Sequence, residues 1–137
     1  MNEFIVWYSN DINKDKFSKE FTLQELISQD HYDYISDSPL LVNYKVDSIN
    51  RGIGLKDTNG KSIYADSSIV EFIAKRLGKP NIKTIGIFKY SDVSLRYNIE
   101  LITAIGDYDL FAYDDINMSQ FEIIDTMQEN KLGLIKA

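Results

Sequence analysis

The chain has 137 residues, of which 44% are apolar and 26% charged, a formal net charge of −6 and no cysteine. These values are typical of one globular domain, and the lack of cysteine excludes disulfides, zinc–thiolate sites and thiol catalysis. No basic stretch precedes the short apolar run at the N-terminus, and no apolar stretch approaches the ~20 residues that cross a bilayer. We therefore expect a cytoplasmic protein without a signal peptide.

The first predicted element is a strand over Phe4–Tyr8, which is apolar on both faces and needs cover on both. The polar residues 9–16 are predicted to form a loop. A short helix is expected over about 22–29, because Thr22 and Glu25 have the spacing of a capping box. Phe21 and Leu26 fit a hydrophobic staple around it, and the expected buried stripe comprises Leu23, Leu26 and Ile27.

The central part of the chain has the alternation of half-buried strands. Residues 40–47 are predicted as a strand, and the chain then turns at Asn59-Gly60, which suits a type I′ hairpin turn. Residues 68–74 and 82–90 are predicted strands joined by a turn rich in Gly and Pro. The clearest alternation covers 93–101, whose apolar face would comprise Val93, Leu95, Tyr97, Ile99 and Leu101.

The last elements are a possible short strand over 110–113 and a closing segment over 119–130. Ser119 and Glu122 would form a second capping box, but the apolar residues that follow suit a strand as well. The pattern alone leaves strand and helix open. The predicted fold class is α+β and mainly antiparallel β, in a single domain over 1–137.

The segment GLKDTNGKSIYADSSIV, residues 54–70, resembles a conserved stretch of the YopX protein family, whose members are encoded by phages and prophages. Phe4 and Trp7 resemble that family's opening strand, and residues 121–130 its closing strand and turn. The chain departs from the family pattern in the four residues after Tyr64, which lack a glycine, and at Asp125 and Lys131. The matching residues are Gly54, Leu55, Lys56, Asp57, Asn59, Gly60, Lys61, Ile63, Tyr64, Ile69 and Val70.

The resemblance implies a compact β-rich core like a small SH3-type barrel with appended elements, and a tendency to self-associate. It implies no catalytic residue, because the family has no established activity. It also favours a strand followed by a turn for the closing segment, and it implies a phage or prophage accessory protein in a bacterial host.

Charge is distributed unevenly along the chain. Residues 1–44 carry eight acids and three bases (−5), residues 45–96 five acids and ten bases (+5), and residues 97–137 eight acids and two bases (−6). Residues 97–130 contain no Lys or Arg. These charges either neutralise one another within the fold or form opposed surface patches that would steer a partner or a second copy.

Candidate sites for catalysis or metal binding are weak. His31 is the single histidine, and although Asp30, Asp33 and Asp37 lie near it, we interpret the stretch as a solvated loop. The spacing in DTNGKS departs from a calcium loop, and RGIG at 51–54 has no following helix to hold phosphate. We therefore predict no catalytic residue, no metal and no cofactor, and a protein that is not an enzyme.

Two binding hypotheses remain, together with self-association into a homo-oligomer. In the first, the acidic segment 97–130 presents carboxylates to a basic surface of a host or phage protein; its candidate residues are Glu100, Asp107, Asp109, Asp114 and Asp115. In the second, the basic hairpin 75–89 holds nucleic acid, with Phe88 or Tyr90 stacking on a base; its candidate cations are Lys75, Arg76, Lys79, Lys83 and Lys89. The first hypothesis is preferred because an acidic chain repels nucleic acid at long range.

Overall fold

A computed structural model describes residues 3–76, 79–93, 95–102, 110–112 and 121–135, without the side chains of 74–82, 96 and 110–112. The strand pairs in these residues are antiparallel and form two sheets, and helices are few. The prediction of a mainly antiparallel β fold is confirmed. The chain divides into two compact units, Met1–Gly52 and Ile53–Ala137. That all of it forms one YopX-like domain stays a prediction.

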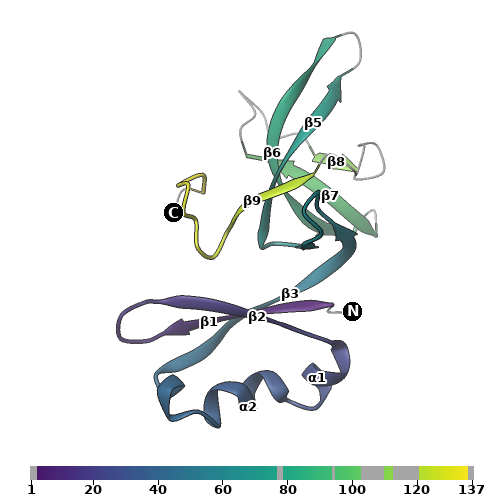
Figure 1. Ribbon diagram of the computed structural model, residues 1–137. Helices are drawn as coiled ribbons and strands as arrows, with labels where there is room; N and C mark the ends of the chain where they lie inside the picture. The colour runs from purple at the N-terminus through teal and green to yellow at the C-terminus, as the bar shows by residue number, and fades with distance from the viewer. Residues whose placement is uncertain (1–2, 77–78, 94, 103–109, 113–120, 136–137) are drawn as a thin grey trace. The chain divides into compact units, whose positions relative to one another are not determined.

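The first unit is a sheet with helices along one face (Figure 1). Strand β1 (Phe4–Asn10) is central, since it pairs with β2 (Lys16–Phe21) on one edge and with the start of β3 (Tyr44–Lys56) on the other. The chain between β2 and β3 contains helix α1 (Leu23–Ile27), helix α2 (Asp30–Ser36) and the 3₁₀ helix η1 (Pro39–Leu41). The predicted strand Phe4–Tyr8 is thus confirmed.

The core of the first unit lies between this sheet and the helices. Val6, Tyr8 and Phe21 are buried, and Leu26 of α1 and Ile35 of α2 pack against them. The Tyr8 hydroxyl donates a hydrogen bond of 2.7 Å to the carbonyl oxygen of His31, which ties α2 to the central strand. Burial of the Tyr8 phenol raises its pKa far above the usual value, so this hydroxyl stays a donor.

Helix α1 begins as predicted. The Thr22 hydroxyl accepts from the Glu25 N–H at 3.2 Å, and the Glu25 carboxylate accepts from the Thr22 N–H at 2.9 Å, which confirms the capping box. This backbone hydrogen bond is the main reason that the pKa of Glu25 lies below its usual value. The predicted buried stripe is only partly correct, because Leu26 packs inward whereas Leu23 and Ile27 are exposed.

Three predictions for the first unit are wrong. The loop expected over 9–16 is shorter, because β1 continues to Asn10 and β2 begins at Lys16. Residues 40–42 are not a strand: Pro39 opens the 3₁₀ helix, in which its fixed φ and missing N–H are tolerated, and β3 starts at Tyr44. The polar stretch after α1 is helix α2 and not a solvated loop.

The second unit contains the end of β3 and strands β4 (Ser62–Tyr64), β5 (Ser68–Arg76), β6 (Lys79–Ser91), β7 (Arg96–Leu101), β8 (Leu110–Ala112) and β9 (Glu122–Thr126). Its five-stranded sheet has the order β8-β7-β6-β5-β9. Figure 1 shows β9, near the C-terminus, lying along β5. In its described residues, 121–130, the closing segment is therefore a strand followed by a turn, whereas Ser119 of the alternative capping box lies outside the described residues. The buried core comprises Ile63, Val70, Phe72, Phe88, Ile99, Leu101 and Phe121.

The hairpin between β3 and β4 has a different turn from the one predicted. The Asp57 N–H donates to the Lys61 carbonyl at 2.8 Å, and the Gly60 N–H donates to the Asp57 carbonyl at 3.0 Å. Gly60 has φ +80°, but Asn59 is not among the residues with positive φ. The turn is therefore a type I turn followed by a left-handed glycine, the usual three-residue hairpin, and not type I′.

The predicted alternation over 93–101 is correct only from residue 97 onward. Tyr97, Ile99 and Leu101 face the core from β7, whereas Val93 and Leu95 lie in the preceding turn with exposed side chains. Leu95 has φ +55°, which a strand would not allow.

No helix in the described residues has the length and apolar character to cross a membrane.

Candidate functional site

The acidic candidates of the segment 97–130 are only partly described. Glu100 lies on β7, where its carboxylate is 3.0 Å from the Lys89 amino group of the neighbouring strand β6. This pair spans adjacent strands, so Glu100 contributes to sheet pairing. Asp107, Asp109, Asp114 and Asp115 lie outside the described residues.

The carboxylates near the C-terminus serve the fold. Asp125 is buried, and it accepts hydrogen bonds from the backbone N–H of Thr126 at 2.8 Å and of Leu132 at 2.9 Å. Burial raises the pKa of Asp125, but these bonds and one from Lys131 outweigh it, so that the pKa lies below its usual value. Glu129 forms an ion pair of 3.2 Å with Lys131.

The basic hairpin is formed by β5 and β6, as expected. Lys75 and Arg76 end β5 and Lys79 begins β6, with side chains outside the description. The other two candidate cations are engaged within the sheet: Lys83 is 3.1 Å from Glu71, and Lys89 pairs with Glu100.

The two aromatic candidates of this hairpin differ in exposure. Tyr90 is half exposed and packs edge-on against Tyr97, with ring centroids 5.4 Å apart. Phe88 is fully buried in the core and packs against Phe121. The suggestion that Phe88 could stack on a base is therefore wrong, whereas the Tyr90 ring is accessible.

His31 is the clearest departure from the sequence interpretation. It lies on α2 with a side chain only 4% exposed, packed against the rings of Phe21 and Tyr32. Its Nδ1 atom is buried without a hydrogen-bond partner. Among the described residues, no three His, Cys, Asp or Glu side chains gather closely enough to hold a metal ion.

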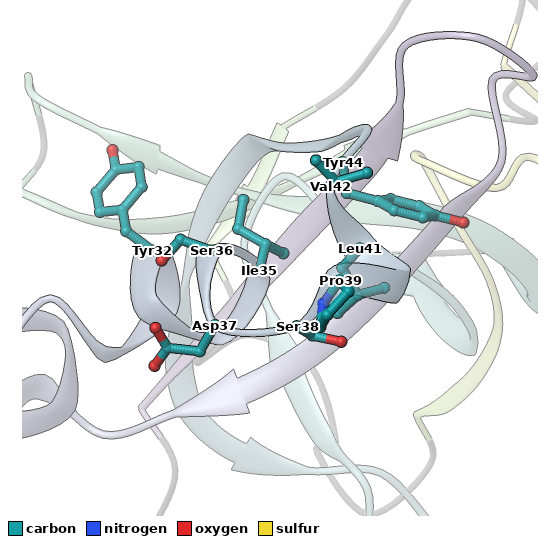
Figure 2. Close-up of a pocket in the computed structure, with 9 residues that line it drawn as sticks. All are labelled: Tyr32, Ile35, Ser36, Asp37, Ser38, Pro39, Leu41, Val42 and Tyr44. Carbon is teal, nitrogen blue, oxygen red and sulfur yellow. The ribbon is translucent and has the colours of Figure 1, made fainter.

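A groove opens beside α2 that the sequence did not indicate. It lies between the C-terminal end of α2, the 3₁₀ helix η1 and the first residue of β3, and its volume is about 570 Å³. In Figure 2, Tyr32 and Tyr44 lie at opposite sides of the view with Ile35 between them. The lining comprises Tyr32, Ile35, Ser36, Asp37, Ser38, Pro39, Leu41, Val42 and Tyr44. We name this hollow the α2–η1 groove.

Apolar residues are exposed beside the α2–η1 groove, and the sequence around its lining residues is acidic. Leu40 and Val42 are 90% and 76% exposed, although both are large apolar residues. The sequence from residue 20 to 44 contains five acids and no Lys or Arg; the acids are Glu20, Glu25, Asp30, Asp33 and Asp37. This absence of bases is the sequence signal that could point to the groove, whereas the alternation over 40–42 favours a half-buried strand.

A second, smaller hollow of about 390 Å³ lies in the other unit. It is lined by Ile87 and Lys89 of β6, Glu100 of β7, Ile102, Met127, Leu134 and Ile135. Its two charged residues are the ion pair already described. It therefore offers an apolar surface whose charges are neutralised.

Comparison with models of protein families finds none that matches this chain, and comparison with curated proteins finds no similar sequence.

Proposed function

We propose that this chain is a phage- or prophage-derived accessory protein, related to the YopX family, that acts by binding a macromolecular partner and not by catalysis. The family relationship is supported by the eleven residues of the stretch 54–70 described above. The α2–η1 groove carries the binding proposal, because exposed apolar side chains beside a hollow are typical of interaction sites.

The partner that fits best is a basic surface of a bacterial host or phage protein. The stretches 20–44 and 97–130 both contain acids and no Lys or Arg, so they attract positive surfaces at long range. In the second stretch, Glu100 is paired with Lys89, which leaves Asp107, Asp109, Asp114 and Asp115 as its candidate contacts. Such a partner would be met in the cytoplasm of the bacterial cell.

The binding proposal is tested by capture from a nuclease-treated bacterial lysate, with the tagged full chain as bait and mass spectrometry as the readout. The captured proteins should be basic and should be released as salt rises, because screening weakens attraction between exposed charges. A variant in which Asp30, Asp33 and Asp37 are all changed to Asn tests the role of the acidic surface. It should capture less of the basic proteins than the unchanged chain does. Capture of acidic proteins, or binding that salt does not affect, would contradict the proposal.

Nucleic-acid binding is the alternative, favoured by the exposed ring of Tyr90 and the five cations of the hairpin 75–89. A gel shift with labelled DNA and RNA at several salt concentrations separates the two. The alternative requires a shift that weakens when Lys75 and Arg76 are both changed to Gln. If the shift is absent at low salt, the alternative fails and the protein-binding proposal is untouched.

We propose also that the strands after Ile53 form a small barrel of the SH3-like kind. The five-stranded order β8-β7-β6-β5-β9 and the common core of β5, β6 and β7 support it. If the sheet closes into a barrel, the backbone amides of the edge strands β8 and β9 are protected from exchange with solvent. Hydrogen exchange measures this protection. Edge amides that exchange as fast as those of the turns would argue for an open sheet.

A further inference from the structure

We propose that the α2–η1 groove is the docking site for an amphipathic helix of a protein partner, with leucine-type anchors on one face and Lys or Arg beside them. This inference rests on the proposed function and names the surface and the chemistry through which it operates. It follows from three observations on the first unit: exposed apolar groups, a concentration of negative charge, and the shape of the hollow.

The apolar side chains next to the groove are not used by the fold. Leu40 and Val42 are largely exposed, while Ile35 in the groove packs on the core of the unit and provides a firm floor. Among the described residues, half of the twelve most exposed large hydrophobics fall between positions 22 and 43. Each exposed aliphatic side chain that a partner covers contributes to binding in proportion to the apolar area removed from water.

The charges define the occupant. Asp37 lines the groove at the C-terminal end of α2, where backbone carbonyl groups already create negative potential. A carboxylate at that end is unfavourable for the helix, and a docked cation relieves the repulsion. The ring of Tyr32, which also lines the groove, is half exposed and offers a second attraction, since ammonium and guanidinium groups bind the faces of aromatic rings.

The groove suits a helix better than an extended strand. Its lining comes from α2, η1, the residues next to them and the start of β3, with Asp37 and Ser38 on one flank and Val42 and Tyr44 on another (Figure 2). A helix satisfies its own backbone hydrogen bonds and needs only side-chain contacts from the groove, with anchors at helical spacing. The volume of about 570 Å³ lies within the range of pockets that bury a drug-sized ligand, which is room for a few anchoring side chains.

The test is a titration of the isotope-labelled full chain, followed by NMR, with a synthetic peptide of about four helical turns. The probe has leucines at helical spacing and lysines elsewhere; a matched peptide has glutamate in place of every lysine. We expect the lysine peptide to shift the amide signals of residues 32–44 and the glutamate peptide to bind at least about ten-fold more weakly. Shifts centred elsewhere, or equal binding of both peptides, would overturn the inference.

Substitutions on the exposed rim give the second measurement. Val42→Ser should lower the affinity for the lysine peptide about ten-fold, because it removes an apolar contact. Asp37→Asn should lower that affinity several-fold at low salt. The matched control is Val93→Ser, which changes a still more exposed valine of the other unit (97% against 76% for Val42) and should leave affinity for the lysine peptide within about two-fold. Circular dichroism checks that each variant folds. If Val42→Ser and Val93→Ser behave alike, the groove is not the docking site.

The inference and the proposed function fail separately. If the wild-type chain captures basic proteins from lysate, and the Val42→Ser and Asp37→Asn variants capture the same proteins in the same amounts, the function stands and the groove is refuted. If the lysine peptide binds the groove but the chain captures no basic protein, the groove stands and the function is refuted.

Discussion

Asp57 is the side chain on which the central hairpin depends most. Its Oδ1 atom accepts from the backbone N–H of Asn59 at 3.0 Å and of Lys61 at 2.8 Å, and its Oδ2 atom accepts from the Ile123 N–H at 3.1 Å. One buried carboxylate therefore orders the turn and joins it to the closing strand β9. Hydrogen bonds to a charged acceptor are stronger than neutral ones.

We expect Asp57→Ala to lower the free energy of unfolding by about 3 kcal/mol, because three N–H groups lose their acceptor at a buried position. Asp57→Asn keeps one acceptor oxygen and should cost about half as much. Urea denaturation measures both. The control is Thr58→Ala in the same turn, an exposed change that should stay within ~0.5 kcal/mol. Similar losses for Asp57→Ala and Thr58→Ala would contradict this account.

Asp125 should make the stability of the fold depend on pH. Its pKa is lower in the folded chain than in the unfolded chain, so its carboxylate stabilises the fold above the unfolded value of ~3.9. That stability is lost as the pH falls through the folded pKa. Asp125→Asn should therefore be clearly less stable than wild type at pH 7, and the difference should shrink below about pH 4. Denaturation curves across this range test it; a difference that is constant with pH would be the contrary result.

At the level of elements, Gly86 determines how closely β6 and β7 approach. A Cβ atom at this position would lie 2.5 Å from Ile99 Cγ2 and 2.9 Å from the backbone oxygen of Glu100. Because the backbone oxygen cannot move aside without disturbing the strand, Gly86→Ala should destabilise the fold by about 2–3 kcal/mol.

Thermal unfolding of a double-mutant cycle isolates this contact. Ile99→Ala removes one of the two clashing atoms, so adding Gly86→Ala to that background should cost less than it does alone. If the stability losses of Gly86→Ala and Ile99→Ala simply add, overpacking against Ile99 is not the cause of the destabilisation by Gly86→Ala.

Elements with a strong internal pattern were predictable from the sequence. The capping box of α1 rests on local interactions, and the strands β5 and β6 rest on sustained alternation. All three are present in the structure. Strand β2 was not predictable, because only Phe17 and Phe21 pack inward and its other residues are polar, as suits a sheet edge.

The candidate site was less predictable than the fold. The α2–η1 groove depends on η1 replacing the expected strand over 40–42, and local alternation cannot distinguish a buried leucine from an exposed one. The burial of His31 likewise depends on packing between α2 and the sheet, which brings the ring against Phe21 of β2.

For the molecule as a whole, the prediction concerns self-association. Segments with net charges of −5, +5 and −6 allow the basic middle of one copy to face an acidic end of another. Association through strand Phe4–Tyr8 is disfavoured because both edges of β1 are hydrogen-bonded, to β2 and to β3. Light scattering during size-exclusion chromatography should thus show an oligomer at low salt.

The oligomer should dissociate near ~1 M salt, where the screening length falls to about 3 Å. An oligomer that tightens with salt would indicate apolar association instead. A monomer at both salt concentrations, even at high protein concentration, would refute self-association.

The hairpin turn also has a consequence for how the protein ages. Asparagine followed by glycine is prone to deamidation, in which the glycine nitrogen attacks the asparagine side chain and leaves isoaspartate. In this turn the Gly60 nitrogen donates to the Asp57 carbonyl, and the Asn59 nitrogen donates to the Asp57 carboxylate. The nitrogen that would attack is therefore held until the hairpin opens. Because deamidation is slow, chemical damage at Asn59 should accumulate in proportion to the fraction of time that the hairpin is open. Each isoaspartate would add one carbon to the backbone between Asp57 and Lys61, whose hydrogen bond closes the turn.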